Sequence, residues 1–295
     1  FEKWKEAVKT IRAEGNVPAK ILVAASFASV LVGPCNCLPF FVHLWGGTES
    51  GKTVGLMLAA SVWANPEMGK YIHTFNSTAV AQELSASFVN SLPLILDELQ
   101  IVKDKKDFDQ IIYQLSEGVG RNRGQKSGGL QRTGTWNNCI ITTGEQPISN
   151  SHSGGGAINR IIEISCEDTK IFKDPAGLVD VIRKNYGHAG KLFIDALMEE
   201  GRMDLAKATQ KGLYKELTET EITEKQALAA SLILTADALI DDLIFQDGNG
   251  LAVKEVAQFL STHEEVSVNL KAYEWLMEWL AQNSARFDED QEKMP

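Results

Sequence analysis

One stretch constrains the fold more than any other, and it runs from Leu38 to Thr53, with the sequence Leu-Pro-Phe-Phe-Val-His-Leu-Trp-Gly-Gly-Thr-Glu-Ser-Gly-Lys-Thr. Its apolar first half predicts a buried strand that ends at Trp45. A turn follows in which glycine, four further residues, glycine, lysine and threonine stand in the order of a phosphate-binding loop. An apolar segment from Val54 to Trp63 then predicts a helix. Because the motif requires a strand before it and a helix after it, this order predicts a nucleotide site.

The residues of this loop predict how a nucleoside triphosphate binds. Glycines let backbone N–H groups turn toward phosphate oxygens, and the N-terminus of the following helix adds its partial positive charge. Lys52 can reach the β- and γ-phosphates, and Thr53 offers its hydroxyl to Mg²⁺. We therefore predict ATP and Mg²⁺ as cofactors, the alternative being a glycine-rich turn with an incidental lysine. The predicted nucleotide-binding residues are Gly46, Gly47, Thr48, Glu49, Ser50, Gly51, Lys52 and Thr53.

A second motif ends the apolar run of residues 92–96, where Asp97 and Glu98 follow directly. An apolar strand that ends in two acids is typical of a Walker B motif, and ligands bind at the carboxyl edge of a parallel sheet. Asp97 is expected to hold Mg²⁺ together with Thr53, and Glu98 to orient and activate the attacking water. The alternative is a strand with an acidic turn, which its place downstream of a phosphate-binding loop disfavours.

The spacing of the two motifs predicts the fold class. One further strand, Tyr71–Phe75, and a helix over 78–89 are predicted between them. P-loop ATPases with a catalytic glutamate, which include the AAA+ proteins, insert a strand at this place and have the parallel sheet order 5-1-4-3-2. We therefore predict an α/β P-loop NTPase of this class. The expected parts are an N-terminal helical segment (1–36), an ATPase core (37–168) and a helical lid and C-terminal region (169–295).

Two later strands carry further candidates. The strand Cys139–Thr143 ends in polar residues, so Thr143 or Thr142 is expected to face the γ-phosphate as a sensor. Arg160 directly precedes the strand Ile161–Ser165. An arginine at this place is well set to reach the nucleotide of a neighbouring subunit as an arginine finger. A local salt bridge is the alternative for Arg160.

Residues 118–136 form a basic island in an acidic chain. They hold four basic residues, six glycines and no acid, so no acid is expected near the cations. The paired glycines Gly128 and Gly129 can close a hairpin. Basic side chains on a projecting hairpin suit a phosphate backbone, and a mobile solvated loop is the alternative. The predicted DNA-contacting residues are Arg121, Arg123, Lys126 and Arg132.

Composition limits the remaining classes of function. The net charge is −10, which excludes a uniformly basic nucleic-acid-binding surface, so any such contact needs a local basic patch. No signal peptide or bilayer-length apolar stretch appears, and the four cysteines lack paired spacing. We expect free thiols, a cytoplasmic location and no membrane contact. Because the chain begins with Phe1, we expect a fragment of a longer protein.

The placed motifs resemble a family of helicase-like P-loop ATPases from phages and mobile elements that is catalogued as a domain of unknown function. More distantly, the order of parts is similar to AAA+ replicative helicases of the minichromosome-maintenance type, whose basic hairpin projects into the central channel of a hexamer. The matching stretches lie within 20–200 and are 43–53, 60–63, 92–99, 143–145 and 185–190.

This resemblance implies a role for each candidate. Lys52, Thr53, Asp97 and Glu98 would lie at the nucleotide, Thr143 would be the sensor, Arg160 the finger, and Arg121, Arg123, Lys126 and Arg132 the DNA grip. One departure is that the predicted helix over 223–244 contains no arginine to act as a second sensor. Arg183 is one candidate for that role, which stays open between Arg183 and other residues.

The sequence thus predicts an ATP-hydrolysing DNA motor, a ring-forming helicase in the replication of a phage or mobile element. It would bind single-stranded DNA through the hairpin and assemble as a homo-oligomer, with a hexamer as one candidate. The alternatives are an AAA+ loader or protein remodeller and a scaffold that binds nucleotide without hydrolysing it. The basic island favours the motor, and the intact Glu98 argues against the scaffold. DNA versus RNA, strand polarity and ring size are not determined.

Overall fold

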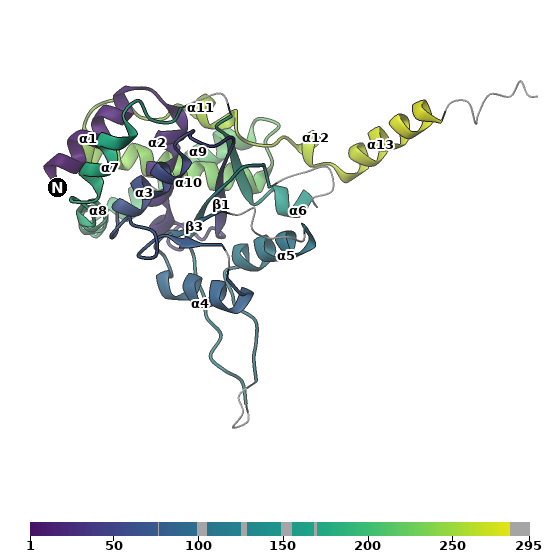
Figure 1. Ribbon diagram of the computed structural model, residues 1–295, viewed down its shortest axis with the longest axis horizontal. Helices are drawn as coiled ribbons and strands as arrows, with labels where there is room; N and C mark the ends of the chain where they lie inside the picture. The colour runs from purple at the N-terminus through teal and green to yellow at the C-terminus, as the bar shows by residue number, and fades with distance from the viewer. Residues whose placement is uncertain (76, 99–104, 125–128, 149–154, 168–169, 284–295) are drawn as a thin grey trace, which may run out of the picture.

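A computed structural model describes residues 1–75, 77–98, 105–124, 129–148, 155–167 and 170–283. The described strands form one parallel five-stranded sheet with helices on both faces, an α/β fold (Figure 1). The strands are β1 (Phe40–Trp45), β2 (His73–Thr74), β3 (Leu94–Asp97), β4 (Cys139–Gly144) and β5 (Ile161–Ser165). The helices are α1 (Glu2–Ala13), α2 (Val17–Ala28), η1 (Ser29–Leu31), α3 (Lys52–Ser61), α4 (Ala79–Val89), α5 (Lys105–Ser116), α6 (Gly155–Ile158), α7 (Pro175–Ile182), α8 (His188–Leu197), α9 (Arg202–Thr218), α10 (Glu224–Ile240), η3 (Asp241–Phe245), α11 (Val253–Ala257), α12 (His263–Val266) and α13 (Val268–Gln282).

The strand order is β2-β3-β4-β1-β5, which is 5-1-4-3-2 when read from the other edge. The central strand β1 pairs with β4 on one side and β5 on the other, and β4 pairs with β3. Because all these pairings are parallel, the carboxyl ends of β1, β3 and β4 lie next to one another at one edge of the sheet. The loop predicted to bind phosphate, the two acids after β3 and the strand that carries the sensor candidates therefore meet at the same edge.

The two faces of the sheet have separate cores. Phe40, Val42 and Leu44 of β1 pack into one cluster with side chains of α2, α3 and α10. Phe41 points to the opposite face and packs with side chains of α4 and α5. Successive side chains along a strand point to opposite faces of the sheet. Because helices cover both faces, the β1 side chains on each face are buried, and nearly all of them are apolar.

The N-terminal helices and α10 pack on the same face of the sheet. Side chains of α1, α2 and α10 belong to one hydrophobic cluster with β1. The predicted division at residues 36 and 168 stays a prediction, and the larger cluster contains residues from all three predicted parts.

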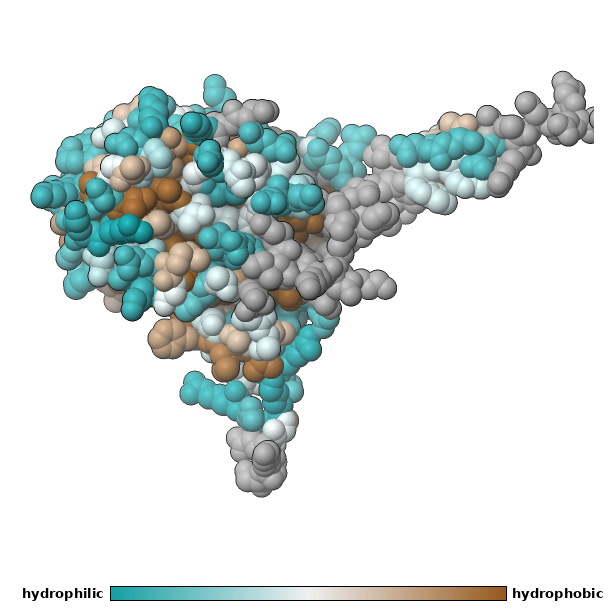
Figure 2. Space-filling view, viewed as in Figure 1, coloured by the Kyte–Doolittle hydropathy of each residue, from teal (hydrophilic) through white to brown (hydrophobic). Residues whose placement is uncertain are grey.

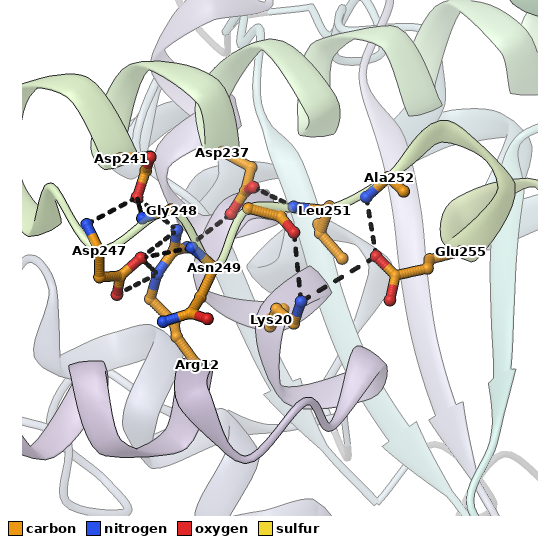
Figure 3. A network of polar contacts seen from close by, with 11 residues as sticks. Arg12, Lys20, Asp237, Asp241, Asp247, Gly248, Asn249, Leu251, Ala252 and Glu255 are labelled. Atoms are coloured by element: carbon orange, nitrogen blue, oxygen red, sulfur yellow. Dashed lines mark hydrogen bonds and ion pairs between the residues drawn. The ribbon is translucent and has the colours of Figure 1, made fainter.

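A buried ion network joins α1 to the end of α10 (Figure 3). The Arg12 guanidinium lies 2.7 Å from Asp237, 3.1 Å from Asp247 and 3.2 Å from Asp241, and its side chain is fully buried. Lys20 of α2 donates to the carbonyl of Gly250, at 3.2 Å. Each of the three guanidinium nitrogens donates to a carboxylate, and these contacts offset the cost of burying the charge.

Side-chain caps set the starts of two helices in the first third of the chain. Asn16 caps α2 by accepting a hydrogen bond from the amide of Ala19, and Thr78 caps α4 by accepting from the amide of Ala81. In the region 251–261 only the short helix α11 forms. Among the described residues, no helix is both long enough and apolar enough to cross a lipid bilayer.

Candidate functional site

The phosphate-binding loop leaves β1 through a glycine that no other residue can replace without strain. Gly46 has φ +143°, and a Cβ atom there would lie 2.8 Å from the backbone carbon of Cys166, which follows β5. At the other end of the loop, Gly51 adopts the left-handed conformation, with φ 97°, directly before α3. Lys52 is the first residue of α3. The loop therefore ends at a helix N-terminus, where anions bind favourably.

The Lys52 side chain folds back over the loop. Its Nζ donates to the carbonyls of Gly46, at 2.8 Å, and Gly47, at 2.6 Å, and contacts the Ser50 hydroxyl at 3.2 Å. These three loop oxygens thus hold the ammonium group against the loop.

The two acids at the end of β3 have different surroundings. Asp97 is buried and accepts hydrogen bonds from the Thr143 hydroxyl of β4 and, at 3.0 Å, from the amide of Glu98. Glu98 is exposed and has φ 60°, in the left-handed region that residues other than glycine rarely adopt. Such strain at the end of a strand is common at functional sites, because it aims a side chain that a relaxed backbone would point elsewhere.

These residues line one cavity of about 480 Å³. Gly46 and Gly47 do not line it, but their carbonyl oxygens accept hydrogen bonds from Lys52, which does. Gly144, Glu145 and Pro175 also line it, although the sequence did not predict them as site residues. The predicted residues in its wall are Thr48, Glu49, Ser50, Gly51, Lys52, Thr53, Asp97, Glu98 and Thr143.

The structure distinguishes the two candidate sensor threonines. Thr143 faces the cavity through its contact with Asp97, whereas the hydroxyl of Thr142 lies 2.9 Å from Nδ1 of His43, its neighbour on β1. Nε2 of His43 lies 3.1 Å from the carbonyl of Gln146. Since only a protonated Nε2 can donate there, Nδ1 is the acceptor for Thr142. Burial lowers the pKa of His43 to about 4, so the ring is neutral and ties β1 to the loop after β4.

Arg160 lies away from this cavity. Its carbonyl accepts from the amide of Phe41 at the start of β1, so it sits at the amino edge of the sheet. Its guanidinium donates to the carbonyl of Gly156, at 2.6 Å, and stacks 4.8 Å from the centre of the Tyr113 ring. Within the described part of the chain no carboxylate pairs with it, and its buried Nε has no hydrogen-bond partner. A finger role therefore needs the nucleotide of another subunit, and it stays a prediction.

The described residues of the basic island, 118–124 and 129–136, form two arms that project from the body, which we call the hairpin (Figure 1). Its arms pair in antiparallel fashion at Val119 with Thr135 and at Gly124 with Leu130. Buried Trp136 ends the second arm, and its indole N–H donates to the carbonyl of Leu115 in α5, at 2.7 Å. The predicted DNA contact Lys126 falls in 125–128, outside the described residues.

The expectation that no acid lies near the hairpin cations is wrong for Arg123. Its guanidinium lies 2.6 Å from the carboxylate of Glu83 in α4, whose side chain is only 4% exposed. The acid is distant in sequence, so the composition of 118–136 did not reveal it. Among the described residues, neither Arg121 nor Arg132 forms an ion pair. A cavity of about 420 Å³ lies between this side of α4 and the hairpin, lined by Arg121, Arg123 and Arg132 among others.

Comparisons with known proteins agree with this architecture. Residues 1–136 match a family described as "Domain of unknown function (DUF927)". No curated protein matches the chain. A solved structure described as "SCCmec type IV Cch - active helicase" superposes with a TM-score of 0.75 at 19% identity, over 100% of this chain and 57% of that one. A structure of JCV helicase aligns over 72% of this chain and 71% of that chain at 13% identity, with a TM-score of only 0.32.

The first of these structures shows the fold. This chain has the α/β fold of a protein described as an active helicase, and it spans a little over half the length of that protein.

Proposed function

We propose that this chain is an ATP-hydrolysing DNA motor, the ATPase part of a ring-forming helicase that acts in replication of a phage or mobile element. One observation carries the proposal. A single cavity at the carboxyl edge of the parallel sheet is lined by side chains from the start of helix α3 and the ends of strands β3 and β4, namely Lys52, Thr53, Asp97, Glu98 and Thr143. These are the groups within one subunit that a P-loop ATPase uses to bind ATP and Mg²⁺ and to orient the attacking water.

The cavity suits a nucleoside triphosphate with Mg²⁺. Its volume of about 480 Å³ lies in the range of ligand sites. Mg²⁺ takes oxygen ligands and needs only one or two from the protein when phosphates supply others. The Thr53 hydroxyl and the Asp97 carboxylate would hold it, and bound there it neutralises charge on the phosphate oxygens. Lys52 would exchange its loop carbonyls for the β- and γ-phosphates.

The remaining polar groups account for hydrolysis. Glu98, exposed in the cavity, would accept a hydrogen bond from the attacking water and orient it toward the γ-phosphate. Thr143 would report the state of that phosphate through its bond to Asp97. The strand order and the glutamate at the end of β3 support placing the chain in the AAA+ group of P-loop ATPases.

The projecting hairpin supports action on DNA. Arg121 and Arg132 lie on its two arms, exposed, on a body whose net charge is −10. A local pair of free cations on an acidic protein favours contact with phosphates. The similarity in order to minichromosome-maintenance helicases suggests a ring with the hairpin in its channel. Arg160 would then reach the nucleotide of the next subunit.

The decisive experiment is ATP turnover by this chain with and without single-stranded oligo(dT). We expect DNA to stimulate turnover. Lys52→Ala should abolish ATP binding, because it removes the cation of the loop, whereas Glu98→Gln should bind ATP and not hydrolyse it. Turnover that DNA leaves unchanged would favour a loader or protein remodeller, and ATP binding without turnover would favour a nucleotide-gated scaffold.

A salt series tests the hairpin. Affinity for a single strand falls with salt with a slope of roughly −0.7 for each phosphate neutralised. The double variant Arg121→Ala/Arg132→Ala should flatten the slope by about that amount for each phosphate that the arginines no longer neutralise. The matched control is Arg202→Ala, which removes a one-third exposed arginine of α9 that lies 3.0 Å from Asp242. An unchanged slope in the double variant would contradict the hairpin's role.

A further inference from the structure

Helix α4 buries two polar side chains and exposes three large apolar ones. Its buried residues include Gln82 and Glu83, while its large apolar side chains face solvent. Val80 is 44% exposed, Leu84 65% and Phe88 90%. These three stand four residues apart and therefore form one stripe along the helix, which we call the α4 stripe. Figure 2 shows hydrophobic side chains gathered over α4 directly above the hairpin.

The stripe lies beside the cations of the hairpin. Leu84 and Ser87 of α4 line the cavity of about 420 Å³ that Arg121 and Arg132 also line. The second arm approaches α4 closely at Gly134, where a Cβ atom would lie 2.7 Å from the Ser87 hydroxyl. The first arm is held by Glu83. Leu84 of the α4 stripe and the two arginines thus line one cavity, and Phe88 lies one helical turn beyond Leu84 on the same stripe.

We propose that this surface is a base-stacking site for single-stranded DNA, in which Phe88 stacks on a base while Arg121 and Arg132 contact the flanking phosphates. The inference rests on the proposed function and adds to it a site outside the hairpin. Single strands are bound by aromatic side chains that stack on bases beside cations that follow the backbone. Duplex DNA keeps its bases stacked inside, so the site selects unpaired strands.

Charge complementarity favours DNA over a second copy of this chain. The exposed residues of α4 include no acid, because its one carboxylate, on Glu83, is buried and paired with Arg123. The surface therefore combines two free cations with apolar area. A single strand of DNA offers a phosphate to each cation and an unpaired base to the apolar stripe, which matches this combination.

The test compares two ligands of equal length and phosphate number, fluorescein-labelled oligo(dT) and an abasic strand, by anisotropy across a salt series. Phe88→Ala should weaken oligo(dT) binding by roughly 5- to 150-fold, the range for loss of one stacked base. Binding of the abasic strand and the salt slope should not change, since no cation is removed. Phe88→Trp should bind oligo(dT) at least as tightly as the wild type, and Phe88→Leu should behave like Phe88→Ala.

Met198→Ala is the matched control, because it removes another apolar side chain, 79% exposed, after α8. It should leave both ligands unaffected, and urea unfolding should show that each variant is as stable as the wild type. The inference is overturned if Phe88→Ala binds oligo(dT) like the wild type, if it weakens both strands equally, or if Phe88→Leu retains full affinity. It is also overturned if Phe88→Ala converts an oligomer to a monomer in sedimentation, which would mark the stripe as a subunit contact.

The two proposals fail in different ways. A wild-type chain that binds neither strand ends the proposed function and this inference with it. A wild-type chain that binds oligo(dT) with a salt-dependent affinity that Phe88→Ala does not alter ends the stacking site alone.

Discussion

The Arg123 guanidinium lies 2.6 Å from the Glu83 carboxylate, and this contact fastens the hairpin to α4. Glu83 also accepts from the Gln114 amide of α5, at 2.5 Å. Next to it on α4, buried Gln82 donates to the carbonyl of Phe75, at 3.3 Å. Phe75 in turn donates its amide to the last residue of β3, which ends at the nucleotide cavity. One helix therefore contacts both the hairpin and the segment beside the candidate ATP site.

Arg123→Ala should destabilise the chain by about 1–3 kcal/mol. It leaves a buried carboxylate unpaired, and the cost falls below that of a fully buried pair because the guanidinium is one-third exposed. Arg121→Ala is the matched control and should change the free energy of unfolding by less than about 0.5 kcal/mol. Urea unfolding measures both.

A double-mutant cycle isolates the pair. Glu83→Gln removes the buried charge, so Arg123→Ala should cost much less stability in that background than in the wild type. Equal costs in the two backgrounds would show that the contact contributes nothing.

Thr143→Val should slow ATP turnover by about 10- to 1,000-fold while ATP still binds. The change keeps the volume but removes the hydroxyl that bonds Asp97 in the cavity. Thr142→Val is the control one residue earlier, because its hydroxyl contacts His43 and not the cavity. Single-turnover kinetics with labelled ATP would separate binding from hydrolysis, and an equal slowing in both variants would contradict the assignment of Thr143 as the sensor.

Arg160→Ala should bind ATP and hydrolyse it roughly 1,000-fold more slowly than the wild type if it acts as a finger. Mixing it with Glu98→Gln should restore part of the activity, because some interfaces would then contain one intact Glu98 and one intact Arg160. Subunit exchange has to be shown in the same samples by energy transfer between labelled chains. Exchange without recovery would argue for a local role of Arg160 beside Tyr113 and Gly156.

Arg12→Met should destabilise the chain by about 3–5 kcal/mol near neutral pH, because it leaves Asp237 charged and buried. Burial raises the pKa of Asp237, and Arg12 acts against that rise. Without Arg12 the folded state should take up a proton at Asp237 more readily than the unfolded state does. The difference in unfolding free energy from the wild type should therefore shrink as the pH falls, and a pH-independent difference would contradict this account.

The buried His43 should make stability depend on pH. Its pKa is about 4 in the folded state and about 6.5 when unfolded, so between about pH 6.5 and about pH 4 the unfolded state binds the proton more readily than the folded state. Its contribution is complete above about pH 6.5 and falls by up to about 1.4 kcal/mol per pH unit until about pH 4. His43→Asn should be less stable at neutral pH yet lose less stability over that interval. Urea unfolding of both proteins from about pH 7 to about pH 5 measures the difference.

The candidate nucleotide site could be predicted from the sequence because its parts are local. The loop of residues 46–53 is contiguous, and Asp97 and Glu98 end one apolar run. Parallel strands bring their carboxyl ends to one edge whatever the details of packing, so the motifs had to meet once the strand order was as predicted. The start of the helix predicted over 78–89 also followed from local capping by Thr78.

Only the tertiary structure decided what surrounds the hairpin. Helix α4 has apolar residues on all its sides, so periodicity could not show that it buries Gln82 and Glu83 and exposes Phe88. The pairing of Glu83 with Arg123 joins segments far apart in the chain, and no local pattern encodes it. The choice of Thr143 over Thr142 likewise depended on which neighbour each hydroxyl meets across the sheet. Contacts between distant segments follow from how helices and strands pack, and the sequence specifies these contacts only through the whole fold.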